Sequence, residues 1–192
     1  IDDNGMPTTV SHEKAGYLDV SPVDLGENAR RDMVLTLEDM GFEVESSHHE
    51  TAPAQHEIAL HYGEAREMAD EVITFKMAVR TVAKRHGLHA TFMPKPRREV
   101  NGSAMHIHFS LFKNGKNIFV DQDDPSKLSE EACFFIGGLL AHSREMALVT
   151  NPLVNSYKRI VPGNEAPAYI VWSSGNRSPL ISVPRTSAKD MH

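Results

Sequence analysis

The spacing of apolar residues predicts two long helices in the first half of the 192-residue chain. The first begins in the Ser21–Asp24 turn, with Ser21 or Asp24 as its cap, and ends near Met40, just before Gly41. The second spans roughly Glu64–His86 and stops at Gly87. Because apolar residues recur every three or four positions in both, each helix is expected to bury one face. They are Met33, Val34, Leu37 and Met40 in the first helix, and Met68, Val72, Phe75, Val79 and Val82 in the second.

Short segments that alternate in polarity, or are briefly apolar, predict strands around these helices. Two of them, Phe42–Ser46 and Gln55–His61, lie between the helices and deliver polar residues at their ends. A third, Met105–Phe112, is expected to form an antiparallel hairpin with the segment 117–120 across a Lys113–Lys116 turn. Two further short strands are predicted at Tyr17–Val20 and Leu88–Met93.

The remainder of the chain completes the predicted fold class. A helix is expected from Leu128 to about Leu148, and the segment from Asn151 onward, rich in Pro, Gly and Asn, is predicted to be irregular. The hairpins favour an α+β fold in which an antiparallel sheet, a partial barrel, is flanked by helices. No linker divides the chain, so residues 1–192 are interpreted as one domain.

Composition narrows the class of protein further. The hydrophobic content of 40% and charged content of 24% are ordinary for a soluble globular protein. The net charge of −6, with dispersed basic residues, does not indicate nucleic-acid binding. No apolar stretch approaches the ~20 residues that cross a bilayer, and the first residues lack the pattern of a signal peptide. A cytoplasmic protein is expected, and its single cysteine, Cys133 in an apolar run, is interpreted as a buried, inert thiol.

The first candidate chemistry lies between the two central strands. Glu50 and Glu57 stand seven residues apart among three histidines, with a proline between them. Hard divalent cations prefer carboxylate oxygens, sometimes with an imidazole, so two antiparallel strands could bring both side chains to one ion. An isolated pair of glutamates is nevertheless more often solvated on the surface, and the spacing alone leaves both interpretations open.

A second polar row is expected on the Met105–Phe112 strand. His106, His108 and Ser110 fall on one face, because side-chain direction repeats every two residues in a strand. One imidazole could bind a metal while its neighbours donate hydrogen bonds. An ordinary solvent-facing strand has the same alternation and stays an alternative.

Loops supply the third group of candidates. Asn101 and Gly102 form a turn that exposes backbone amides. Arg159 and Arg177 lie on irregular segments and could bind carboxylate or phosphate bidentately, while a proline-flanked loop presents Glu165. Solvated side chains on a coil are the alternative. The sequence contains neither a phosphate-binding Gly-rich loop nor a nucleophile elbow.

Together, six motifs in this order resemble bacterial type I glutamine synthetase, over essentially residues 3–184. The Glu50-to-Glu57 spacing is similar to that of the enzymes from Gram-positive bacteria. The motifs are His48-His49-Glu50 to Gln55-His56-Glu57, Phe92-Met93-Pro94-Lys95-Pro96, Asn101-Gly102-Ser103-Ala104-Met105-His106, Asn155-Ser156-Tyr157-Lys158-Arg159, Pro162-Gly163-Asn164-Glu165-Ala166-Pro167 and Asn176-Arg177-Ser178.

The resemblance implies a reaction and a set of roles. The family joins ammonia to glutamate with ATP, through γ-glutamyl phosphate, and uses two Mg²⁺ or Mn²⁺ ions. It implies that Glu50 and Glu57 bind one ion and His106 the other. The remaining implied roles are nucleotide contacts for Tyr62, His108, Ser110 and Arg177, glutamate binding for Asn101, Gly102 and Arg159, and catalysis for Glu165, on a mobile flap, with Arg159 and Arg177.

The resemblance also sets expectations about the chain as a whole. It covers the middle of the family's proteins, without their N-terminal β-grasp domain and without the metal-binding glutamates beyond either end. We therefore expect this polypeptide alone to be inactive, since the family's active sites form between subunits of a dodecamer. The alternatives are a γ-glutamyl ligase that uses another amine, such as methylamine or a polyamine, and a non-catalytic remnant that binds metal or partner subunits.

Overall fold

A computed structural model describes residues 2, 4–6, 8, 10–121, 123, 127–163, 165–175 and 179–184 of the chain. Their backbone contacts divide the chain into two compact units, Ile1–Ala104 and Met105–His192. The division falls between the Asn101–Gly102 pair and His106, so the predicted site residues are shared between the units. Each unit is described by itself.

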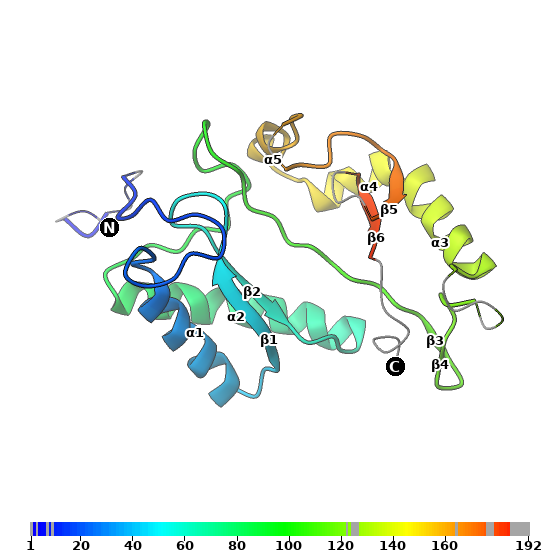
Figure 1. Ribbon diagram of the computed structural model, residues 1–192, viewed down its shortest axis with the longest axis horizontal. Helices are drawn as coiled ribbons and strands as arrows, with labels where there is room; N and C mark the ends of the chain where they lie inside the picture. The colour runs from blue at the N-terminus through cyan, green and yellow to red at the C-terminus, as the bar shows by residue number, and fades with distance from the viewer. Residues whose placement is uncertain are drawn as a thin grey trace. The chain divides into compact units, whose positions relative to one another are not determined.

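The first unit packs two helices and one hairpin around a small apolar core. Its elements are α1 (Glu27–Asp39), β1 (Val44–His49), β2 (His56–Leu60) and α2 (Ala65–Arg85). Helix α1 contacts both α2 and β1 (Figure 1). The apolar residues buried in this region include Ala29, Leu37, Phe42, Val79, Val82 and Ala83. Leu37, Val79 and Val82 of the predicted stripes are therefore in the core, whereas Met40 is 50% exposed.

Both predicted helices are confirmed, with sharper ends. The side chain of Glu64 accepts hydrogen bonds from the backbone N–H groups of Arg66 and Glu67 and so caps α2. Gly41 and Gly87 follow the two helices with φ of 94° and 69°, a left-handed conformation that glycine adopts at low cost. Helix α1 begins only at Glu27. The segment 21–26, where the helix was predicted to begin, forms non-helical turns.

Strands β1 and β2 form the predicted antiparallel hairpin. His48 pairs with Glu57 and His49 pairs with His56, and the N–H of Glu50 donates to the oxygen of Gln55 at 2.7 Å. Successive side chains of a strand point to opposite faces, so this register puts His48 and Glu57 on one face and His49 and His56 on the other. Position 50 is two residues beyond His48 and continues the first face.

Two predicted strands of the first unit are absent from its described residues. Tyr17–Val20 forms a turn, in which Leu18 has a φ of 61° that no strand residue adopts. Its N–H donates to the oxygen of His49 at 3.0 Å, one contact rather than a ladder. Leu88–Met93 has no partner strand, and Phe92 packs its ring on Phe75 instead, 6.1 Å between centroids. Alternating polarity in the first segment and apolar content in the second predicted strands, but neither segment pairs with another strand.

The second unit contains the other hairpin and two consecutive helices. Strands β3 (Phe112–Lys113) and β4 (Lys116–Asn117) pair across the predicted turn, where Asn114 and Gly115 both have positive φ. The predicted Met105–Phe112 strand is wrong over most of its length, because residues 105–111 carry no strand and are exposed. The predicted helix is two helices, α3 (Glu130–Ala141) and α4 (Ser143–Thr150), which meet at an angle of 71°.

The last part of the chain is more regular than predicted. Helix α5 (Val154–Arg159) is followed by β5 (Trp172–Ser174) and β6 (Ile181–Val183), which pair in parallel. The buried, inert thiol is also a wrong prediction, because Cys133 is exposed on α3. That helix is apolar around most of its circumference, so an apolar neighbourhood in sequence did not mark its buried face.

The combination of helices and small sheets fits the α+β class in outline only. The described residues form three two-stranded sheets, two antiparallel and one parallel, and no closed barrel. A barrel needs each strand to hydrogen-bond on both edges, and here every strand has one neighbour. Among the described helices, none is long and apolar enough by itself to cross a membrane, although α3 and α4 would suffice together by length and composition.

Candidate functional site

The face of the β1–β2 hairpin that carries His48 gathers three groups that can bind a metal, and it is half-buried. One ligand atom each from His48, Glu50 and Glu57 lies within 4.8 Å of the others. Nε2 of His48 is 3.1 Å from Oε1 of Glu50. The cluster follows from the register, since His48 and Glu57 are direct cross-strand partners and Glu50 is two residues further along the same face.

The chemistry of this cluster fits a hard divalent cation. Two carboxylates and an imidazole are the donor set expected for Mg²⁺ or Mn²⁺. The Oε2 atom of Glu50 accepts the N–H of Thr51 at 2.9 Å, which fixes the carboxylate and leaves its Oε1 atom on the side of His48. The ring of Tyr17 meets the ring of His48 edge to face, with centroids 5.6 Å apart. The structure thus brings the side chains of Glu50 and Glu57 close together.

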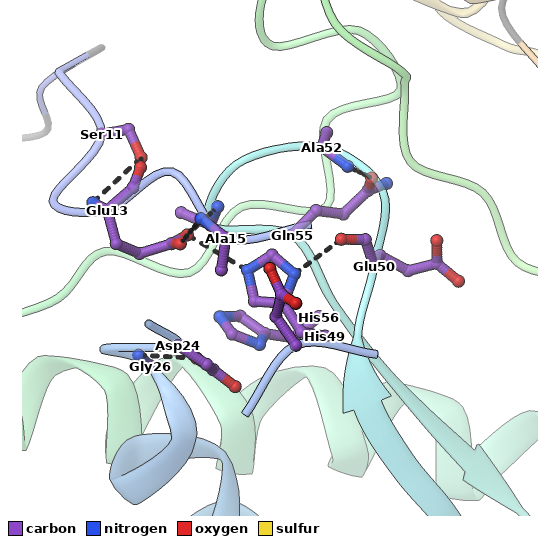
Figure 2. Close-up of polar contacts among 12 residues, drawn as sticks. Ser11, Glu13, Ala15, Asp24, Gly26, His49, Glu50, Ala52, Gln55 and His56 are labelled. Carbon is purple, nitrogen blue, oxygen red and sulfur yellow. Dashed lines mark hydrogen bonds and ion pairs between the residues drawn. The ribbon is translucent and has the colours of Figure 1, made fainter. Parts of the chain in front are cut away.

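The opposite face of the hairpin carries a buried ion pair. Nε2 of His49 is 3.1 Å from Oε1 of Glu13, and the two side chains are 0% and 1% exposed. Figure 2 shows His49 between the carboxylate of Glu13 and the backbone oxygen of Glu50, which lies 2.6 Å from Nδ1. The N–H groups of Ala15 and Ala54 also donate to the Glu13 carboxylate. Both ring nitrogens of His49 thus face oxygen atoms, one of Glu13 and one of the Glu50 backbone.

The neighbouring histidine, His56, is neutral. Nδ1 of His56 is 2.7 Å from Nη1 of Arg30, and a guanidinium only donates, so Nδ1 accepts and His56 is neutral. The pKa of His56 is lowered from 6.5 to about 4, chiefly by burial and next by the charge of Arg30. The same Nη1 atom is 2.6 Å from Oδ2 of Asp24. Burial raises the pKa of Asp24, but hydrogen bonding and the charge of Arg30 outweigh it, and the net pKa is lowered.

A second group of potential metal ligands lies on this buried face, but its members already interact with other side chains of the protein. Asp24, His49 and His56 also have ligand atoms within 4.8 Å of one another. The guanidinium of Arg30 contacts Asp24 and His56, and both nitrogens of His49 are engaged by protein oxygens. A metal ion would have to displace a cation already bound, so this group is a structural network.

The hairpin connection reaches the Asn101–Gly102 pair through Gln55. Nε2 of Gln55 donates to the oxygen of Gly102 at 2.8 Å, and its Oε1 accepts the N–H of Ala52 at 3.2 Å. The N–H of Ser103 donates to the oxygen of Pro94 at 2.9 Å and closes a loop. The turn in this loop lies at Arg98 and Glu99 rather than at Asn101 and Gly102, where it was predicted. Two predicted parts, the carboxylate pair and the Asn101–Gly102 pair, are thus joined by one side chain.

The other predicted residues are distributed along both units. Tyr62 follows β2, 65% exposed, with its ring 4.3 Å from that of His61. In the second unit, His106, His108 and Ser110 are exposed on an extended segment without strand pairing, so the predicted shared strand face is not present. Glu165 is exposed with a φ of 48°. Arg177 lies outside the described residues.

Arg159 is held at the end of α5 with an unused donor. It is half-buried, and its Nε is a buried atom without a hydrogen-bond partner among the described residues. Burial lowers the pKa of its guanidinium. A buried donor without a partner is costly in a folded protein, and an arginine at such a position is suited to an anionic ligand.

The polar residues that pack on the buried face of the hairpin were not predicted from the sequence. His49 and His56 could have been assigned to the buried face from strand alternation, once the register was known. Glu13 lies 36 residues before His49 in the chain and had no local signal. Arg30 belonged to the polar side of a predicted helix, yet its side chain is buried beside Asp24.

Comparison with known proteins identifies the family. Residues 3–192 match the glutamine synthetase catalytic domain, and the chain belongs to that family. It is 60% identical over 183 residues to a glutamine synthetase of Clostridium saccharobutylicum, covering 95% of this chain and 41% of that protein. A glutamine synthetase of Thermus thermophilus is 57% identical over 180 residues, covering 94% of this chain and 40% of its own length. The chain therefore spans about two fifths of the curated relatives it matches.

Solved structures agree with this assignment. A glutamine synthetase of Plasmodium falciparum, determined by cryo-electron microscopy, superposes with a TM-score of 0.83 at 37% identity, covering 93% of this chain and 34% of that one. A structure of GmaS without ligand gives a TM-score of 0.83 at 33% identity and covers 96% of this chain and 44% of the other. The resemblance noted from the motifs is confirmed.

Proposed function

We propose that the protein containing this chain is a glutamate–ammonia ligase that forms glutamine at the expense of ATP. The observation that carries the proposal is the cluster of His48, Glu50 and Glu57, whose ligand atoms lie within 4.8 Å of one another in a member of the glutamine synthetase family. Membership of the family and the donor set support the same chemistry.

In this proposal the reaction has two steps. The γ-carboxylate oxygen of glutamate attacks the terminal phosphorus of ATP, which releases ADP and gives γ-glutamyl phosphate. Ammonia then attacks the acyl carbon, and phosphate leaves. Phosphoryl transfer depends on charge neutralisation and positioning more than on covalent help from the protein. Bound Mg²⁺ or Mn²⁺ supplies that neutralisation.

Residues of the first unit hold the cation and glutamate. Glu50 and Glu57 bind one divalent ion, with His48 as an additional donor beside Glu50 at 3.1 Å. Asn101 and Gly102 bind glutamate, and the backbone oxygen of Gly102 is tied to the hairpin by Gln55. Tyr62, largely exposed after β2, contacts the nucleotide base by stacking.

Residues of the second unit bind the charged groups of the substrates. Arg159, half-buried at the end of α5, binds the glutamate carboxylate through its guanidinium. His106 binds the second ion, while His108, Ser110 and Arg177 contact the nucleotide. Glu165 takes a proton from the incoming ammonium, and its exposed loop excludes water from the acyl phosphate. The protein works as a homo-oligomer, a dodecamer as in bacterial enzymes of this family.

A chimera tests the proposal directly. This chain replaces the matching 183-residue segment of the C. saccharobutylicum protein, and ADP release is followed with glutamate or ammonia omitted in turn. We expect turnover that needs both substrates and a divalent ion. The same chimera with Glu57→Gln controls for residual activity, and methylamine or a polyamine in place of ammonia tests the alternative acceptors. A folded chimera that releases no ADP with any amine contradicts the proposal.

A further inference from the structure

Gln55 lies between two groups of residues with different proposed ligands. One group is the cation site at Glu50 and Glu57, and the other is the glutamate-binding pair Asn101 and Gly102. Gln55 is in the connection between β1 and β2, after Glu50 and before Glu57. Its side chain reaches Gly102, 47 residues further along the chain. It is half-buried, and it has no charge of its own.

All four polar groups of Gln55 are used, and their partners fix the orientation of its side-chain amide. Its backbone oxygen accepts the N–H of Glu50 at 2.7 Å, and its backbone N–H donates to the oxygen of Ala52 at 3.0 Å. Oε1 accepts the N–H of Ala52 at 3.2 Å. Nε2 donates to the oxygen of Gly102 at 2.8 Å. Since Ala52 N–H can only donate and the Gly102 carbonyl can only accept, the amide cannot be flipped.

Few side chains could replace Gln55 in this position. Glutamate keeps the acceptor for Ala52 but presents an oxygen to the Gly102 carbonyl in place of a donor. Asparagine has both groups but is one methylene shorter. A side chain that carries an acceptor and a donor at this reach is therefore required by the geometry, while the folding of the hairpin connection needs only the acceptor.

We propose that Gln55 is a positioning residue that couples the cation site at Glu50 and Glu57 to the glutamate-binding pair Asn101 and Gly102. The inference rests on the proposed function for the identity of the two ligands. Glu50 is tied through its backbone to Gln55, so a cation that fixes Glu50 also fixes the amide that holds Gly102. Coupling of this kind is reciprocal, so glutamate bound at this pair raises affinity for the cation by the same factor.

Nuclear magnetic resonance of the 192-residue chain tests the coupling without substrate. Mg²⁺ alone is titrated while the backbone amides of Thr51, Gly102 and Ser103 are followed. In the wild-type chain all three are expected to shift with one midpoint, Thr51 because its N–H donates to Glu50 and the other two through Gln55. In Gln55→Glu the shift of Thr51 should remain, and the shifts of Gly102 and Ser103 should be lost. Ser46→Ala, an exposed change on the same hairpin, should behave as wild type.

The outcomes separate the inference from the function on which it rests. Shifts of Gly102 and Ser103 that persist in Gln55→Glu, or that are absent in the wild type while Thr51 titrates, overturn the coupling alone. If the chemical shift of the Thr51 amide does not change with Mg²⁺ in the wild type, the metal site is refuted and with it both proposals. If Gln55→Glu does not fold, the coupling is tested by the side-chain NH₂ signals of wild-type Gln55 during the Mg²⁺ titration. They should shift with the midpoint of Thr51, and signals that stay fixed refute the inference.

Discussion

The imidazole of His49 is held between the Glu13 carboxylate, 3.1 Å from Nε2, and the backbone oxygen of Glu50, 2.6 Å from Nδ1. The buried ion pair thus lies directly behind a residue of the proposed cation site. Glu13 also accepts the N–H of Ala54 in the hairpin connection. The pair therefore fixes both the strand end and the loop that follows it.

Replacing His49 should destabilise the chain strongly. In His49→Phe the Glu13 carboxylate is left buried without its cationic partner, and the loss of one member of such a pair typically costs about 3 kcal/mol or more. Urea unfolding followed by circular dichroism, in the presence of a chelator, measures the free energy. His61→Phe, at a site where the imidazole is 45% exposed, is the control and should change it by less than about 0.5 kcal/mol.

The double variant Glu13→Gln/His49→Phe distinguishes lost charge pairing from lost packing. Removing the carboxylate charge should restore part of the stability, because no unpaired charge remains buried. A double variant less stable than the sum of the single changes predicts would refute the ion pair.

Glu57→Gln should weaken cation binding. The amide keeps the size of the side chain but removes one of two anionic ligands, and we expect Mn²⁺ affinity to fall about tenfold or more. Electron paramagnetic resonance of free Mn²⁺ gives the affinity of the 192-residue chain. Glu45→Gln removes the same charge from an exposed position of β1, outside the cluster, and should leave the affinity almost unchanged. Equal losses in both variants would indicate a general charge effect.

The neutral state of His56 predicts how stability depends on pH. Its pKa is lowered from 6.5 to about 4 in the folded chain, so the unfolded chain binds a proton at higher pH than the folded chain does. The contribution of neutral His56 to the free energy of unfolding is fully present above pH 6.5. It is lost as pH falls toward 4, by about 3 kcal/mol in total. Asp24, with a pKa lowered from 3.8, contributes in the same direction only at lower pH.

His56→Gln isolates this effect. The glutamine oxygen can still accept from Arg30, but it does not titrate. Urea unfolding of both proteins at intervals between pH 7 and 4, without divalent ions, should give a stability difference that narrows as the wild type loses its contribution. A difference independent of pH would contradict the neutral assignment of His56.

Arg159→Met should stabilise the second unit while abolishing ligation. The substitution removes a guanidinium whose Nε is buried without a partner, which in other proteins costs about 1 kcal/mol. Urea unfolding of the chain measures the gain, and the chimera with the same substitution measures the loss of ADP release. Lys158→Met removes a neighbouring exposed cation and should alter neither by much. Lower stability in Arg159→Met would mean that the guanidinium has a structural role.

Much of the first unit could be predicted because its signals are local. Helices α1 and α2 have apolar stripes and glycine stops within their own sequence, and the structure confirms both. The β1–β2 hairpin was also predicted, since its strands flank a short connection. The segments Tyr17–Val20, Leu88–Met93 and most of Met105–Phe112 were wrongly predicted as strands, because a strand requires a partner that lies elsewhere in the chain.

The candidate site divides in the same way. The metal-compatible residues could be predicted without a structure, because the family's motifs and the carboxylate spacing are visible along the chain. Tertiary structure alone decided which side of the hairpin each histidine occupies and which charges neutralise them. His49 meets a carboxylate because Glu13, 36 residues earlier in the chain, lies against it, and His56 is neutral because Arg30 approaches from α1. Protonation depends on neighbours in space, and the linear sequence does not specify those neighbours.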